Sequence, residues 1–218
     1  MSRYRTSDHP MMAAVAWDPA RPAVRITDFL MMVHATSNCY LIAGNDGDLL
    51  INAATLTQGP RAREKFEQLL GRSLNIGKIV FTQSHPDHTG GWAVFAQGGT
   101  TMIAQREFER INAERKLLGP FFAARNRRVL SLLIPPAKEG GDYWFNGSDP
   151  VPAQTFSDSL DFEFSGRQFH LFTLSSGETE DSLGVWLPGE KILFIGNWAG
   201  AIMGAFPHFH TARGDRDR

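Results

Sequence analysis

Short apolar runs separated by polar turns dominate the first half of the chain. Runs of this length, rich in Val, Ile, Leu and Phe, are typical of buried β-strands. The strands expected here cover Val24–Val33, Asn38–Ala43, Asp48–Ala53, Lys78–Thr82 and Thr100–Ala104. The turn Gly44-Asn45-Asp46-Gly47 lies between the second and third runs and predicts that they form a hairpin.

A different spacing marks the helices. Pro60 suits a first helical turn, Phe66, Leu69 and Leu70 after it fall on one face, and Gly71 is placed to end the helix. Further helices are expected over Trp92–Gln97, Arg106–Leu118 and Phe121–Leu133.

The second half of the chain reads mainly as strands. A loop rich in Gly, Pro and Asp covers Pro135–Pro152, and it is followed by expected strands at Leu160–Phe164, Arg167–Leu174, Ser182–Leu187 and Lys191–Ile195. Strands with interspersed helices indicate a layered α/β or α+β fold. Residues 1–25, rich in proline and charge, read as a loosely structured lead-in to a domain over residues 26–218.

Composition narrows the class of protein. With 218 residues, 42% of them hydrophobic, the chain is long enough for one large domain. Its 22 Lys and Arg against 23 Asp and Glu give no basic excess, so a nucleic-acid partner is not expected. The single cysteine, Cys39, excludes an internal disulfide and a multi-cysteine zinc site. No apolar stretch is long enough to span a membrane and no secretory signal is convincing, so we expect a soluble, cytoplasmic protein.

One polar cluster carries the candidate chemistry. The strand that ends at Thr82 leads into Gln83, His85, Asp87 and His88, which are followed by two glycines. Imidazole and carboxylate are the usual ligands of Zn²⁺, and a loop lets ligands at alternate positions face one point. The alternative is a polar loop in which Asp87 caps the following helix and the histidines are solvated.

This cluster also resembles a known family. The run K-I-V-F-T-Q-S-H-P-D-H-T-G-G is similar to the T-H-x-H-x-D-H-x-G-G signature of the metallo-β-lactamase superfamily, with Gln83 at the place of the first histidine. Residues 176–179 stand where the superfamily has its G-H-T ligand, and residues 191–197 resemble its V-L-F-x-G-D strand. The resemblance spans about residues 36–200 and implies an α+β fold, a four-layer αββα sandwich of two similar halves.

Two departures from the superfamily pattern resemble the alkylsulfatase branch. Glu178 replaces the usual histidine ligand, and that branch has a glutamate in this context. His208, Thr211 and Arg213 match the spacing of its N-x-x-T-x-R-G stretch, whose arginine contacts the sulfate. The resemblance thus implies that these three residues bind substrate. The alternative is that they lie in an exposed, solvated tail.

The resemblance implies a set of metal ligands as well. Gln83, His85 and Glu178 would hold one Zn²⁺ and leave a position open, and a second ion would use Asp87, His88 and Asn197. Asp87 is the candidate catalytic base, acting on a water whose pKa a metal lowers to about 7. Glu178 could instead be a plain loop carboxylate and Asn197 a turn residue. The second ion lacks a bridging carboxylate, and the superfamily's further histidine would lie beyond residue 218.

These observations predict a metal-dependent hydrolase. Its expected substrate is a small-molecule ester of an apolar alcohol, most specifically an alkyl sulfate, with Arg213 holding the anionic end. A lactonase, thioesterase or β-lactamase-like activity, or a non-catalytic relative that has lost its metal, are the alternatives. Too few residues follow Pro150 for a complete second half, so we expect a C-terminally truncated fold. An uncovered sheet edge would favour association, for example as a homodimer.

Overall fold

The computed structural model describes residues 17–121, 124, 148–174, 178–200 and 208–209. Within these ranges the expected strands and helices are recovered with ends shifted by one or two residues, apart from the first strand. Most of the expected helix Phe121–Leu133 lies outside the described residues.

The first sheet holds seven described strands in chain order. They are β1 (Val24–Arg25), β2 (Leu30–Val33), β3 (Cys39–Ile42), β4 (Asp48–Ile51), β5 (Ile76–Val80), β6 (Thr101–Gln105) and β7 (Gln154–Phe156). The first four pair antiparallel, including the predicted β3–β4 hairpin, and β4 to β7 pair parallel. The prediction of one continuous strand from Val24 to Val33 is wrong, because the Thr27 hydroxyl accepts the backbone N–H groups of Phe29 and Leu30 and turns the chain.

The second sheet is antiparallel and lies over the first. Its order is β11-β10-β9-β8, with β8 (Ser159–Phe164), β9 (Arg167–Thr173), β10 (Leu183–Leu187) and β11 (Ile192–Phe194). A separate two-residue pair joins β12 (Ala199–Gly200) to β13 (His208–Phe209).

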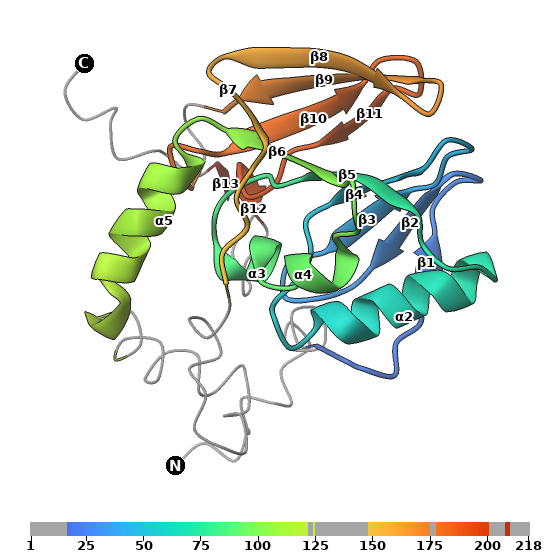
Figure 1. The fold of residues 1–218 in the computed structure, drawn as a ribbon, viewed down its shortest axis with the longest axis horizontal. Helices are drawn as coiled ribbons and strands as arrows, with labels where there is room; N and C mark the ends of the chain where they lie inside the picture. The colour runs from blue at the N-terminus through green and yellow to red at the C-terminus, as the bar shows by residue number, and fades with distance from the viewer. Residues whose placement is uncertain (1–16, 122–123, 125–147, 175–177, 201–207, 210–218) are drawn as a thin grey trace.

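The described helices are α2 (Gly59–Leu70), α3 (Pro86–Thr89), α4 (Trp92–Phe95) and α5 (Phe108–Leu117). As predicted, α2 ends at Gly71, whose left-handed backbone (φ 68°) lets its N–H reach the carbonyl of Glu67. Figure 1 shows α2 and α4 below the first sheet, the second sheet above it and α5 to one side.

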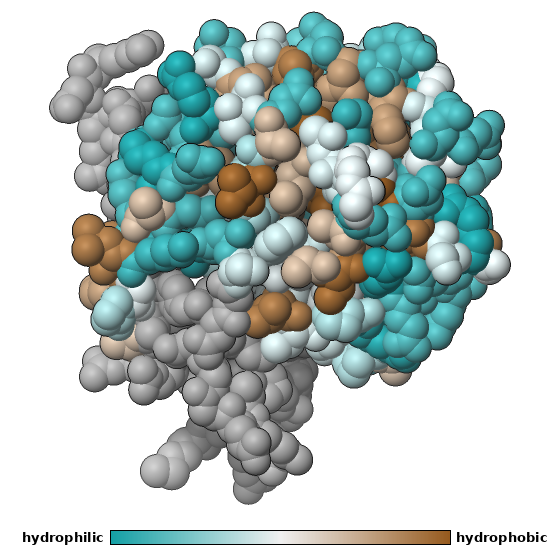
Figure 2. Space-filling model, in the orientation of Figure 1, coloured by the Kyte–Doolittle hydropathy of each residue, from teal (hydrophilic) through white to brown (hydrophobic). Residues whose placement is uncertain are grey.

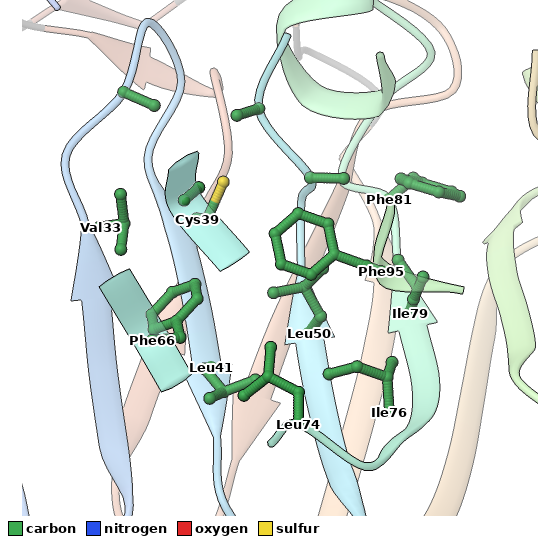
Figure 3. Close-up of a cluster of buried hydrophobic side chains, with 14 of the residues drawn as sticks. Val33, Cys39, Leu41, Leu50, Phe66, Leu74, Ile76, Ile79, Phe81 and Phe95 are labelled. Atoms are coloured by element: carbon green, nitrogen blue, oxygen red, sulfur yellow. The ribbon is translucent and has the colours of Figure 1, made fainter. Parts of the chain in front are cut away.

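Two apolar cores hold these layers together. The first, shown in Figure 3, joins α2 and α4 to the first sheet through Phe66 and Phe95. The second lies between the sheets and includes Val80 from the first sheet and Leu171 and Val185 from the second. Cys39 is fully buried in the first core. The layers are therefore helix, sheet and sheet, and no helix of the described residues covers the outer face of the second sheet. The two stacked sheets with helices on one side agree with the predicted α+β sandwich.

On the face seen in Figure 2, hydrophilic and hydrophobic residues are interspersed, as is usual once the largest apolar groups are inside. None of the helices in the described ranges combines the length and the apolar character that a bilayer crossing requires.

Candidate metal centre

The polar cluster lies where the parallel strands β4 and β5 end. Asn52 follows β4 and Thr82 follows β5, and their side chains tie the two strand ends together. The Asn52 amide oxygen accepts the Thr82 backbone N–H at 3.0 Å, and its amide nitrogen lies 3.0 Å from the Thr82 hydroxyl. Both residues are buried, so the start of the motif loop is fixed in place.

The two glycines after the motif are required by close packing. A Cβ on Gly91 would overlap the carbonyl oxygen of Ala53 and lie 2.8 Å from the Cα of Gly59. A Cβ on Gly90 would lie 2.6 Å from the backbone nitrogen of Leu56. Without side chains here, α3 and α4 pack directly on the loop that follows β4, which places the motif at the sheet edge.

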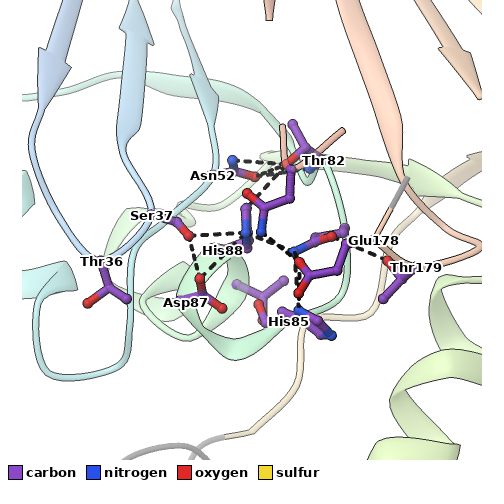
Figure 4. A network of polar contacts seen from close by, with 12 residues as sticks. Thr36, Ser37, Asn52, Thr82, His85, Asp87, His88, Glu178 and Thr179 are labelled. Carbon is purple, nitrogen blue, oxygen red and sulfur yellow. Dashed lines mark hydrogen bonds and ion pairs between the residues drawn. The ribbon is translucent and has the colours of Figure 1, made fainter. Parts of the chain in front are cut away.

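Three of the predicted ligands lie close to the side-chain nitrogen of a further predicted ligand, Gln83. The Gln83 Nε2 atom lies 3.2 Å from His85 Nδ1, 3.0 Å from His88 Nε2 and 3.1 Å from Glu178 Oε2. Figure 4 shows His85, His88 and Glu178 facing this common region, although Glu178 belongs to the distant loop before β10. Gln83 itself is fully buried.

Asp87 and His88 are held by a serine from another loop. The Ser37 hydroxyl donates to Asp87 Oδ2 and lies 3.1 Å from His88 Nε2, while His88 Nδ1 lies 3.2 Å from the Thr82 hydroxyl. The N-cap residue of α3 is His85, and no side chain accepts a hydrogen bond from the first N–H groups of the helix. His88 is 1% exposed. Asp87 therefore does not cap the helix and His88 is not solvated, whereas the His85 side chain is 29% exposed.

Asn197 joins the same group through Glu178. Its amide nitrogen donates to Glu178 Oε2 at 2.7 Å, so the structure brings together all six predicted metal ligands. The backbone of His208 pairs with Gly200 in the β12–β13 ribbon that follows Asn197. Thr211 and Arg213 lie outside the described residues.

The surroundings of each group shift its pKa. Burial lowers the pKa of His85, but the hydrogen bond and charge of Glu178, with smaller contributions from Asp87 and Asp181, outweigh it and leave that pKa above its usual value. Burial holds the pKa of His88 below its usual value. For Glu178, burial raises the pKa, but the hydrogen bond and charge of His85 outweigh it and hold the carboxyl pKa well below its usual range.

The centre holds acidic groups in excess. Asp181 is fully buried, and neither of its carboxylate oxygens has a hydrogen-bond partner in the described residues. Arg115, whose guanidinium bonds Asp149, also acts electrostatically on Asp181 and Asp87, and Glu178 lies 3.5 Å from His85 Nδ1. Buried carboxylates need a compensating cation, because an unpaired buried charge is costly.

The donor types here suit zinc, although the ligands are not closed around an ion. Two imidazoles and a carboxylate form a known catalytic zinc set. As they stand, however, no three His, Cys, Asp or Glu side chains in the described part of the chain form a group that could hold a metal. The amide of Gln83 occupies the point on which the other donors converge. The imidazole and carboxylate donors are therefore of the types that bind zinc, and the Gln83 amide lies between them.

Sequence reasoning missed four residues of this centre: Ser37, Asn52, Thr82 and Asp181. Asn52 and Thr82 each follow an apolar run, and polar residues at the carboxyl ends of neighbouring parallel strands meet at one edge. That signal was sufficient to find both. Ser37 and Asp181 carry no such signal, since only the tertiary fold brings their loops to the motif.

Comparison with known proteins places this geometry in a family. Residues 34–197 match the family model of the metallo-beta-lactamase superfamily. The chain is 24% identical over 200 residues to a linear primary-alkylsulfatase of Pseudomonas sp. (strain ATCC 19151), a match covering 82% of this chain and 36% of the relative. It is 43% identical over 47 residues to the metallo-beta-lactamase type 2 of Bacteroides fragilis, covering 22% of this chain and 19% of that protein.

Solved structures share the fold. The stereoselective inverting sec-alkylsulfatase from Pseudomonas sp. superposes with a TM-score of 0.65 at 20% identity, covering 79% of this chain and 30% of that one. A metallo-beta-lactamase from Pontibacter korlensis gives 0.56 at 18% identity, covering 83% and 73%. The chain thus spans about a third of the length of the alkylsulfatases it matches. The extent of the family match confirms the predicted resemblance: this chain belongs to the metallo-beta-lactamase superfamily.

Proposed function

We propose that this chain is the metal-binding part of a hydrolase that cleaves an ester, most specifically an alkyl sulfate. The observation that carries the metal dependence is the gathering of carboxylates and imidazoles at this strand edge. Glu178 and the imidazoles of His85 and His88 surround the Gln83 amide, Asp87 lies 3.6 Å from His88, and the buried Asp181 carboxylate has no hydrogen-bond partner among the described residues. A divalent cation would neutralise this excess of negative charge.

His85, His88 and Glu178 would hold the ion, and Gln83 and Asn197 lie in contact with these ligands. Zinc bound there would supply Lewis acidity and lower the pKa of a coordinated water to about 7. Asp87 would accept a proton from the attacking water, since its carboxylate is fixed by the Ser37 hydroxyl and is only partly buried. Hydrolysis adds that water across the ester and releases an alcohol and the acid.

The relatives and the charge of the centre support the proposed substrate class. Two of the relatives are alkylsulfatases. A sulfate ester is an anion and would be repelled by this acidic centre unless cations receive it. We propose that Arg213 binds the sulfate oxygens through paired N–H donors, with Thr211 and His208 beside it. The possible homodimer and the cytoplasmic location stay predictions from the sequence.

Sulfate release from octyl sulfate, measured by ion chromatography on the zinc-loaded chain, tests this function. Activity should disappear with a chelator and in His85→Ala, and it should fall by about a hundredfold or more in Asp87→Asn, the range of a lost general base. Arg106→Ala, an exposed arginine outside the centre, is the matched control and should keep full activity. Hydrolysis that survives both the chelator and His85→Ala would sink the proposed metal dependence.

β-Lactam hydrolysis is the second candidate. The 43% identity to the Bacteroides fragilis enzyme is confined to 47 residues, but it is the higher local identity of the two curated relatives. Turnover of a chromogenic cephalosporin without any sulfate release would favour this activity over sulfate ester hydrolysis.

A further inference from the structure

The amide of Gln83 acts as a hydrogen-bond donor at the centre of the metal ligands. Its Nε2 atom carries two N–H groups and lies 3.1 Å from Glu178 Oε2, to which it donates, 3.0 Å from His88 Nε2 and 3.2 Å from His85 Nδ1. An imidazole nitrogen that binds a metal is unprotonated and is therefore also an acceptor for this amide. The opposite amide orientation would turn the carbonyl oxygen toward the Glu178 carboxylate, and two acceptors repel. The present orientation also lets the Gln83 oxygen accept the Thr179 hydroxyl at 3.3 Å.

A metal ion would bind to the same imidazole and carboxylate atoms that now contact this amide. Zinc lies about 2.0–2.2 Å from nitrogen and oxygen ligands, whereas the three acceptors stand 3.0–3.2 Å from the Gln83 nitrogen. The ion cannot occupy the centre while the amide does. Zinc entry must therefore break the amide's hydrogen bonds and bring the donors closer together.

The backbone offers no easy way to move the amide aside. Thr82, next to Gln83, is bonded through its N–H and hydroxyl to Asn52, and its carbonyl accepts the N–H of Leu183 at 2.9 Å. The amide must leave by rotation of its own side chain. A second amide, that of Asn197, donates to the same Glu178 oxygen at 2.7 Å. Both neutral substitutes for the expected ligands thus face this carboxylate through N–H groups.

We propose that Gln83 is an internal competitor of the metal, whose amide bonds the expected metal ligands and lowers their affinity for zinc. This inference rests on the proposed metal dependence of the site. It reverses the role that the family resemblance implies for Gln83, because a ligand strengthens metal binding and a competitor weakens it. The two roles predict opposite signs for the same substitution.

The change in zinc affinity on substituting Gln83 is measured on the full 218-residue chain at neutral pH. A chromogenic chelator buffers the free Zn²⁺ and reports its concentration. Gln83→Ala should bind zinc about ten-fold more tightly than the wild type, the factor expected when one hydrogen bond to a charged group no longer competes. Gln83→His, which replaces the competing donor by an imidazole ligand, should bind more tightly still. Gln105→Ala is the matched control: it also removes a buried amide, which bonds Ser157 and Glu107, and should leave zinc affinity unchanged.

Folding of each variant is checked by circular dichroism and thermal melting. If Gln83→Ala does not fold, Gln83→Met replaces it, because methionine keeps the length of the side chain without its donor. Weaker zinc binding in the Ala or Met variant, or binding within two-fold of the wild type, would overturn the competitor role while leaving metal dependence intact. No zinc on the wild type, Gln83→Ala or Gln83→His would overturn both proposals together.

Discussion

Replacing Asn52 by alanine should destabilise the fold at the edge of the metal centre. The Asn52 side chain bonds both the backbone N–H and the hydroxyl of Thr82, and Asn52 is 4% exposed. Its backbone has φ 60°, in the left-handed region that asparagine tolerates better than most residues. The substitution therefore removes two buried hydrogen bonds and puts alanine into an unfavourable backbone conformation.

The two effects add to a large cost for one residue. Leaving the buried Thr82 N–H unpaired costs about 1–3 kcal/mol. Alanine in the left-handed region adds about 1 kcal/mol. The free energy of unfolding should fall by about 2–4 kcal/mol, and the melting temperature by about 4–16 °C for a chain of this size. Glycine adopts the left-handed backbone conformation without strain, so Asn52→Gly should cost about 1 kcal/mol less than Asn52→Ala.

Urea unfolding followed by circular dichroism measures both variants against the wild type. The difference between Ala and Gly isolates the backbone contribution, and the cost they share reports the hydrogen bonds. A loss below about 0.5 kcal/mol for Asn52→Ala, the range of ordinary surface substitutions, would refute the argument that this side chain joins the ends of β4 and β5.

Three further predictions concern packing, charge and pH. Gly91→Ala should destabilise by about 3 kcal/mol or more, whereas Gly98→Ala, where an added Cβ meets nothing within 4 Å, should be neutral within about 0.5 kcal/mol in the same urea assay. Arg72→Ala should cost about 2 kcal/mol or more because it leaves the fully buried Asp48 carboxylate without its two guanidinium bonds of 2.7 and 2.8 Å; a loss under 0.5 kcal/mol would contradict this. Burial raises the pKa of the Cys39 thiol, so above pH about 8.5 only the unfolded thiol ionises and stability should fall by up to about 1.4 kcal/mol per pH unit. Cys39→Ala should lose that slope, and rapid alkylation of the native thiol at pH 9 would show that it is not buried.

Much of the centre followed from local sequence. The apolar run before Thr82 predicted a strand, and the Gly-Gly pair after the motif proved necessary because a Cβ at Gly91 has no room. The pattern failed at Val24–Val33, where apolar residues continue through a turn. Thr27 makes that turn by bonding backbone N–H groups, a contact that periodicity does not register.

The role of Gln83 could not be read from the motif alone. Its amide orientation depends on Glu178, which is 95 positions away in the chain, and on Thr179 beside it. Spacing within the motif places Gln83 among ligands but does not say which end of the amide faces them. Asp181 is similar, because only the fold buries its carboxylate next to two histidines.

Zinc bound per chain is the most direct test of the central claim, measured by equilibrium dialysis and elemental analysis of the wild type and His85→Ala at about 100 μM free zinc. The account predicts about one zinc per wild-type chain and a loss of most of it in His85→Ala, with both proteins folded. No zinc on a folded wild-type chain, or equal amounts on both proteins, would contradict a metal centre built on His85, His88 and Glu178.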